Sequence, residues 1–118
     1  MPGEGADVLV VGGGPAGSSC AWRLRRAGLD PLVLDQAAFP RDKPCAGWVT
    51  PAALEALEFD AHDYRQGRVF QPITAFVTGQ VGAGAVETDY GRPVSFGILR
   101  REFDEYLLRR SRARVCEG

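Results

Sequence analysis

An apolar run at the start of the chain, Val8–Val11, leads directly into three glycines at the spacing G-x-G-x-x-G: Gly12, Gly14 and Gly17. Pro15 suits the first turn of a helix, and the helical pattern then runs to Ala27 and stops at Gly28. In a strand-turn-helix unit, the first glycine permits the tight turn. The second lets the backbone approach a pyrophosphate, and the third lets the helix pack closely on the strand. Together with the positive end of the helix dipole, this pattern predicts a dinucleotide-binding turn.

A second predicted strand, residues 31–34, ends in Asp35, which lies 23 residues after Gly12. A carboxylate at this place accepts hydrogen bonds from the adenosine ribose. Gln36 and Ala37 supply no arginine for a 2′-phosphate, which argues against NADP. The residues alone leave both FAD and NAD open. We predict that seven residues of this unit bind the cofactor: Gly12, Gly14, Pro15, Ala16, Gly17, Asp35 and Gln36.

Composition limits the partners of the chain. A net charge of −1 over 118 residues gives no basic field of the kind that drives nucleic-acid binding, and no apolar run reaches membrane-spanning length. The three cysteines are widely spaced and form neither a disulfide framework nor a zinc pattern, so no metal is expected. We expect a cytoplasmic location. The single histidine, His62, is expected in a solvated loop.

Several elements follow from periodicity. The stripe Ala16, Cys20, Leu24 and Ala27 predicts the buried face of the first helix, and no regular structure is expected from residue 36 to residue 50. Thr50 and Pro51 open a short helix that ends at Leu57. Residues 69–78 and 85–89 predict a β-hairpin, and residues 94–99 an extended piece.

The last elements are a helix and a strand. The helix spans about residues 101–112 and has an apolar face formed by Phe103, Tyr106, Leu107 and Leu108. Its acidic residues, Glu102, Asp104 and Glu105, fit the first turn as the helix dipole prefers, and a strand begins near Val115. The order predicts an α/β, interrupted Rossmann fold whose parallel sheet is split by antiparallel strands, and we expect the fold to continue beyond residue 118.

Two further motifs carry a resemblance to a known family. Residues 39–47 read F-P-R-D-K-P-C-A-G, and residues 99–104 read L-R-R-E-F-D. With the glycine-rich turn, these segments resemble the geranylgeranyl reductases of the flavoprotein superfamily that also includes aromatic hydroxylases and halogenases. The family pattern has a glycine where this chain has Ala46, and more often a glutamate where it has Asp35.

The resemblance implies FAD as cofactor and a flavin-dependent oxidoreductase that reduces carbon–carbon double bonds of an isoprenoid-type substrate. It adds five cofactor-binding residues, Arg41, Cys45, Ala46, Gly47 and Arg100. It also makes Cys45 the candidate catalytic residue, although Cys45 could simply be a small packed side chain. The alternatives are a monooxygenase or halogenase of the same superfamily, or a noncatalytic nucleotide-binding fragment.

The resemblance also implies a division of the chain. Residues 1–60 would begin the FAD-binding domain and include a flavin-flanking loop at 36–50. Residues 61–99 would be antiparallel strands of an inserted substrate domain, and residues 100–118 a helix that returns to the first domain. The implied partners are a hydrophobic small molecule and an external electron donor, either NAD(P)H or a reduced carrier. A lipid-like substrate could bring peripheral membrane contact.

Overall fold

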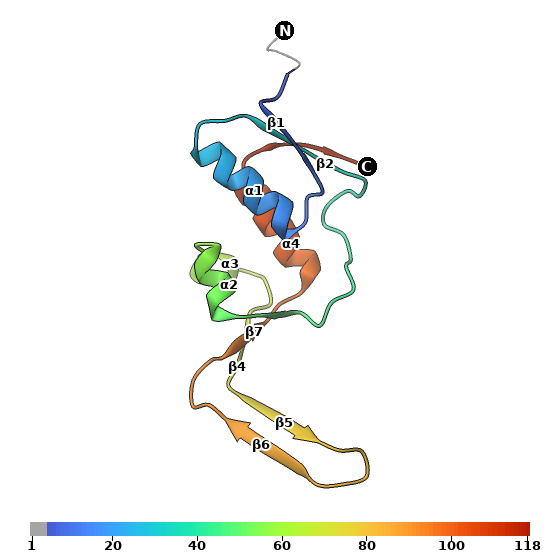
Figure 1. Cartoon of the computed structure of the whole chain (residues 1–118), viewed down its shortest axis with the longest axis vertical. Coiled ribbons are helices and arrows are strands. Elements are labelled where there is room, and N and C mark those ends of the chain that lie inside the picture. The colour runs from blue at the N-terminus through green and yellow to red at the C-terminus, as the bar shows by residue number, and fades with distance from the viewer. Residues whose placement is uncertain (1–4) are drawn as a thin grey trace. The chain divides into compact units, whose positions relative to one another are not determined.

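The computed structural model describes residues 5–118, which fall into two compact units. Unit 1 is formed by Met1–Pro44 together with Arg100–Gly118, and unit 2 by Cys45–Leu99. In Figure 1 the colour follows the chain from blue at the N-terminus to red at the C-terminus. The chain therefore leaves unit 1 and returns to it, as an interrupted Rossmann fold requires.

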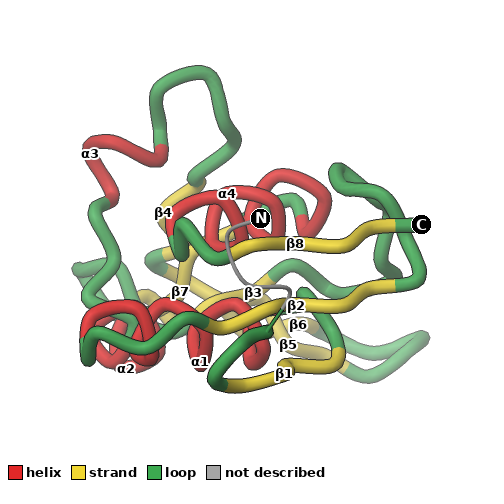
Figure 2. Tube along the Cα trace, turned by 90° about the horizontal axis from the view of Figure 1, so that it is seen from above, coloured by secondary structure: helices red, strands yellow, loops and turns green. Residues whose placement is uncertain are grey.

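Unit 1 contains a three-stranded parallel sheet. Its strands are β1 (Val8–Val11), β2 (Pro31–Asp35) and β8 (Arg114–Glu117), in the order β1-β2-β8. Figure 2 shows these strands side by side. Val33 of β2 lies opposite both Val10 of β1 and Val115 of β8, which aligns the apolar residues across the sheet. The strand predicted near Val115 is confirmed, and it forms the third parallel strand.

Two helices complete unit 1, α1 (Pro15–Arg26) and α4 (Arg100–Arg110), which pack against each other. The predicted apolar face of α4 is confirmed, since all four of its residues are buried. A core cluster that includes Leu108 of this face joins the sheet, the loop after β2 and both helices: Val10, Ala21, Val33, Phe39 and Leu108.

The predicted buried stripe of α1 is wrong except at Leu24, which is partly buried and packs against the core. Cys20 is exposed, as are Ala16 and Ala27, and the buried positions are Ser18 and Ala21. The reason is the close approach of α1 to β1 at Gly17, which turns the face bearing Gly17 and Ala21 toward the sheet. The apolar periodicity is ambiguous here because small residues occur all round this helix.

Unit 2 holds short helices and antiparallel strands. Its three-stranded sheet has the order β3-β7-β4, and a separate two-stranded hairpin pairs β5 with β6. The elements in chain order are β3 (Trp48–Val49), α2 (Pro51–Ala56), α3 (Ala61–Tyr64), β4 (Gln71–Ile73), β5 (Ala75–Gly79), β6 (Ala85–Asp89) and β7 (Ser95–Gly97).

Three expectations for unit 2 need correction. The expected long strand 69–78 is interrupted at Thr74, so β4 pairs with β7 and only β5 pairs with β6. The segment expected to be irregular contains β3, which pairs with β7. His62 is exposed as expected, but it lies in α3, which Asp60 caps by accepting a hydrogen bond from the Asp63 N–H. Tertiary pairing decides these short elements, and a single sequence does not show it.

The predicted helix after residue 50 is confirmed. The Thr50 hydroxyl oxygen accepts a hydrogen bond from the Ala53 N–H at 3.2 Å, and Pro51 occupies the first helical position. An aromatic cluster then packs unit 2, with the rings of Phe70 and Phe96 stacked at 4.6 Å. Within residues 5–118, none of the helices is both long and apolar enough to cross a bilayer.

Candidate nucleotide-binding site

The glycine-rich turn lies between β1 and α1. Gly12 has φ +100°, a conformation that L side chains rarely adopt, and its N–H donates to the Leu34 carbonyl at 2.8 Å. Gly14 is the N-cap of α1 and supplies no side-chain cap. The N–H groups of the first helical turn therefore remain directed at the turn, as in anion-binding helix termini.

The second and third glycines have different surroundings. A Cβ placed on Gly17 would collide with the Gly12 carbonyl oxygen, so Gly17 is required for the packing of α1 on β1. A Cβ placed on Gly14 would have only the Nη2 atom of Arg41 within 4 Å, at 3.7 Å. The space beside Gly14 is therefore open to a ligand, with a guanidinium group at its edge.

Asp35 connects the end of β2 to this turn. Its Oδ2 accepts a hydrogen bond from the Gly13 N–H at 2.7 Å, and its Oδ1 accepts one from the Ala37 N–H at 2.9 Å. The hydrogen bond from Ala37 contributes most to holding the pKa of Asp35 below its ordinary value. The Gly13 N–H and the nearby charges of Arg41 and Lys43 act in the same direction, whereas burial opposes them. Asp35 is therefore an ionised acceptor beside the turn.

The loop after Asp35 covers one side of the turn. Phe39 is buried, and its ring carbons would lie 3.3 Å from a Cβ on Gly13. Glu117 of β8 accepts hydrogen bonds from the Phe39 N–H at 3.2 Å and from Arg109 at 3.0 Å. The third parallel strand thus holds the loop in place.

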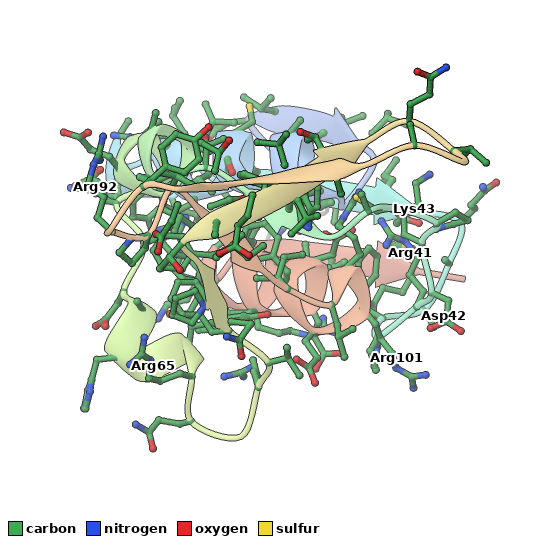
Figure 3. The ribbon with its side chains drawn as sticks, turned by 90° about the horizontal axis from the view of Figure 1, so that it is seen from below. Arg41, Asp42, Lys43, Arg65, Arg92 and Arg101 are labelled. Carbon is green, nitrogen blue, oxygen red and sulfur yellow. The ribbon has the colours of Figure 1, made fainter. Side chains whose placement is uncertain are left out.

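Arg41 follows on the same loop. Its guanidinium lies 4.6 Å from the centroid of the Phe39 ring, and its Nη1 donates to Oδ2 of Asp104 at 2.8 Å. Figure 3 shows Arg41, Asp42 and Lys43 along this loop, with Arg101 near Asp42. Arg41 is thus oriented both by an aromatic face and by a carboxylate.

Asp104 of α4 is fully buried and is shared by two arginines. Arg100, one helical turn earlier, donates through Nε to Oδ1 at 2.7 Å and through Nη2 to Oδ2 at 2.9 Å. The expectation that Asp104 lies in the first turn of the helix is wrong, because α4 begins at Arg100 and only Glu102 is an acidic residue of that turn. The Asp104 carboxylate instead joins a buried ion pair. Arg41 and Arg100 were both selected from sequence motifs, and both donate hydrogen bonds to the Asp104 carboxylate.

The remaining predicted site residues belong to unit 2. The exposed Cys45 accepts a hydrogen bond through Sγ from the Gly47 N–H at 3.4 Å, and Ala46 is exposed. Gly47 has φ +73°, and a Cβ there would collide with the Ile98 carbonyl oxygen. Packing against Ile98 therefore explains this glycine within unit 2. The cofactor and catalytic roles of these residues stay predictions.

Unit 1 brings together nine of the predicted cofactor-binding residues: Gly12, Gly14, Pro15, Ala16, Gly17, Asp35, Gln36, Arg41 and Arg100. Gln36 is exposed at the end of β2. Sequence reasoning missed the roles of Phe39 and Asp104 here. Both stand inside motifs noted in the sequence, Phe39 two residues before Arg41 and Asp104 four residues after Arg100.

Comparison with known proteins agrees with this geometry. Residues 10–64 match the family model described as an NAD(P)-binding Rossmann-like domain. A menaquinone reductase of Mycobacterium tuberculosis is 57% identical over 54 residues, which are 46% of this chain and 13% of that protein. A geranylgeranyl diphosphate reductase of Rhodobacter capsulatus is 37% identical over 112 residues, 89% of this chain and 25% of that protein.

Over most of its length the chain is thus similar to a geranylgeranyl diphosphate reductase. A geranylgeranyl bacteriochlorophyll reductase-like protein from Thermoplasma acidophilum has the same fold, with a TM-score of 0.80, 22% identity, and coverage of 95% of this chain and 30% of that one. The chain spans a quarter or less of the length of both curated relatives described above.

Halogenases share the fold as well. The myxobacterial chondrochloren halogenase CndH, an FAD-dependent halogenase, has a TM-score of 0.71 and 26% identity over 95% of this chain and 28% of that one. The fold therefore does not by itself separate reductases from halogenases.

Proposed function

We propose that this chain forms the FAD-binding part of a flavin-dependent oxidoreductase that reduces carbon–carbon double bonds of an isoprenoid-type substrate. The observation that carries the proposal is the pairing of an ionised Asp35, fixed to the turn through Gly13, with an open space beside Gly14. A ribose with free hydroxyls needs the first, and a pyrophosphate needs the second.

The residues present fit the ADP half of FAD. Gly14 leaves room for the phosphates, and the first turn of α1 with Pro15, Ala16 and Gly17 offers its N-terminal dipole to them. Asp35 would accept from the ribose hydroxyls on lone pairs that Gly13 and Ala37 leave unused. The same carboxylate would repel a 2′-phosphate, which disfavours NADP as the ligand of the glycine-rich turn.

Arg41 would supply positive charge at the phosphates. Its Nη2 is the nearest group on the open side of Gly14, and Nη1 is held by Asp104. We place Gln36 and Arg100 with these cofactor contacts, and Cys45, Ala46 and Gly47 beside the flavin ring. These placements follow the family motifs. Bound reduced flavin would supply hydride for the double bond, and the protein residues would bind and orient the cofactor and the substrate.

The reductase assignment rests on the family likeness. The motif of residues 43–45, K-P-C, is of the reductase type, and the geranylgeranyl diphosphate reductase matches 89% of the chain. A hydrophobic small-molecule substrate and an electron donor, NAD(P)H or a reduced carrier, belong to this proposal, as do a cytoplasmic location and peripheral membrane contact. Residues 61–99 would be strands of the substrate domain.

The test has two stages, both made on the full chain. First, fluorescence titration compares FAD with FMN, NAD⁺ and NADP⁺. We expect tight binding of FAD alone, and absence of FAD binding would contradict the proposal. Second, the protein is reduced without oxygen and mixed with a geranylgeranyl substrate, and mass spectrometry follows the gain of two hydrogens for each double bond.

A second candidate is a halogenase or other monooxygenase, which the structural similarity to CndH favours. Oxygen uptake by the reduced protein, coupled to substrate modification and without saturation of double bonds, would select this alternative. FAD binding with neither reaction would leave a noncatalytic nucleotide-binding protein.

A further inference from the structure

We infer that Asp104 is a positioning residue for the nucleotide phosphates, which acts through Arg41. The inference rests on the proposed function, because it requires a phosphate-bearing cofactor beside Gly14. Asp104 itself touches no part of the turn in the contacts described for residues 5–118. It holds the arginine that lies at the edge of that space.

The geometry gives Asp104 control over the direction of Arg41. Nη1 of Arg41 donates to Oδ2 of the carboxylate at 2.8 Å, while Nη2, on the other arm of the guanidinium, lies nearest to Gly14. The Phe39 ring, 4.6 Å away, packs against the guanidinium. Because Asp104 binds Nη1 and the Phe39 ring covers one face of the planar guanidinium, Nη2 stays directed toward the glycine-rich turn.

Arg100 makes this arrangement stable. It binds both carboxylate oxygens of Asp104, at 2.7 and 2.9 Å, and so fixes the orientation of a carboxylate that is fully buried. The guanidinium groups of Arg41 and Arg100 and the single carboxylate of Asp104 form a cluster with a net positive charge. The cluster can therefore balance its buried carboxylate and still attract an anion.

Charge and position predict opposite results when Asp104 is neutralised. Asp104→Asn makes the cluster more positive, so electrostatic attraction alone would tighten binding of a doubly charged pyrophosphate. If the carboxylate positions Arg41, the same variant weakens binding. We expect the dissociation constant for FAD to rise about ten- to a hundredfold, the loss of one charge-assisted hydrogen bond.

The matched control is Asp42→Asn. This substitution makes the same change of charge on the loop next to Arg41, but Asp42 is 89% exposed and its contact with Arg101 is 3.7 Å long. We expect its FAD affinity to stay within about twofold of the unsubstituted protein, as for an exposed ion pair. Both proteins are titrated with FAD, and the melting temperature of each is measured without cofactor.

A double-mutant cycle separates positioning from a general structural role. In a chain that already carries Arg41→Gln, adding Asp104→Asn should lower FAD affinity by a smaller factor than it does in the unsubstituted chain, because the part of its effect that passes through Arg41 is already lost. Independent losses that multiply would overturn the inference. So would unchanged or tighter FAD binding by the single variant Asp104→Asn.

A second variant covers the case in which Asp104→Asn does not fold. Arg41→Lys leaves Asp104 paired with Arg100 and keeps the positive charge, but an ammonium group cannot hold the carboxylate and reach the turn as a planar fork does. We expect about a tenfold loss of FAD affinity. Normal binding by this variant would contradict the inference, whereas failure of the unsubstituted protein to bind FAD would contradict the proposed function instead.

Discussion

The Oδ2 atom of Asp35 lies 2.7 Å from the Gly13 nitrogen, a hydrogen bond that joins the end of β2 to the glycine-rich turn 22 residues earlier. The carboxylate thus has a structural role in the turn as well as the proposed contact with ribose. Substitutions at Asp35 should therefore change both stability and nucleotide binding.

The contribution of Asp35 to stability should depend on pH. Its pKa is held below the ordinary value of 3.8, so the unfolded chain binds the proton more tightly than the folded chain does. The stabilisation is then complete above pH 3.8 and is lost as pH falls through the lowered pKa. In urea unfolding, the advantage of the unsubstituted protein over Asp35→Asn should be constant near neutral pH and shrink below 3.8. An advantage that does not change with pH would contradict this account.

Gly17→Ala should destabilise the fold. The added Cβ meets the Gly12 carbonyl oxygen, so α1 has to move away from β1. Overpacking of this kind typically costs about 1–3 kcal/mol, which urea unfolding would detect. Stability equal to that of the unsubstituted protein would show that the helix does not need this close approach.

Gly14→Ala should leave the stability of the fold almost unchanged but weaken FAD binding. Its φ of −67° suits any residue, and only Arg41 Nη2 lies within 4 Å of the added Cβ. Stability should change by no more than about 0.5 kcal/mol. The FAD dissociation constant should rise by about tenfold or more, since the methyl group occupies the space proposed for the phosphates. Equal FAD affinity in titrations of both proteins would place the phosphates elsewhere.

Cys45→Ser should leave the fold intact. Cys45 is exposed, and a serine oxygen can still accept from the Gly47 N–H. If Cys45 lies beside the flavin as proposed, the substitution should alter turnover or the absorption spectrum of the bound flavin more than the melting temperature. A lower melting temperature with unchanged turnover would assign Cys45 a packing role.

Local chemistry explains the parts that could be predicted from the sequence. The glycine spacing, Pro15 at the start of α1 and the cap at Thr50 act over a few residues, so their consequences can be derived without knowing the fold. The apolar face of α4 follows from periodicity for the same reason. The Rossmann-like arrangement was predictable because these local signals occur in the required order.

Contacts between distant residues could not be derived in this way. Asp104 and Arg41 are 63 positions apart, and the carboxylate is buried only because the returning helix α4 places it against the loop after β2. A charge on a helix is usually solvated, so its sequence position gave no sign of the ion pair. Cys20 is exposed because the approach at Gly17 sets the rotation of α1, and Phe39 covers Gly13 because Glu117 of β8 holds its backbone. Propensity and spacing thus determined which segments form the nucleotide-binding unit. Tertiary packing alone decided which charged side chains face its turn, because burial selects partners across the fold.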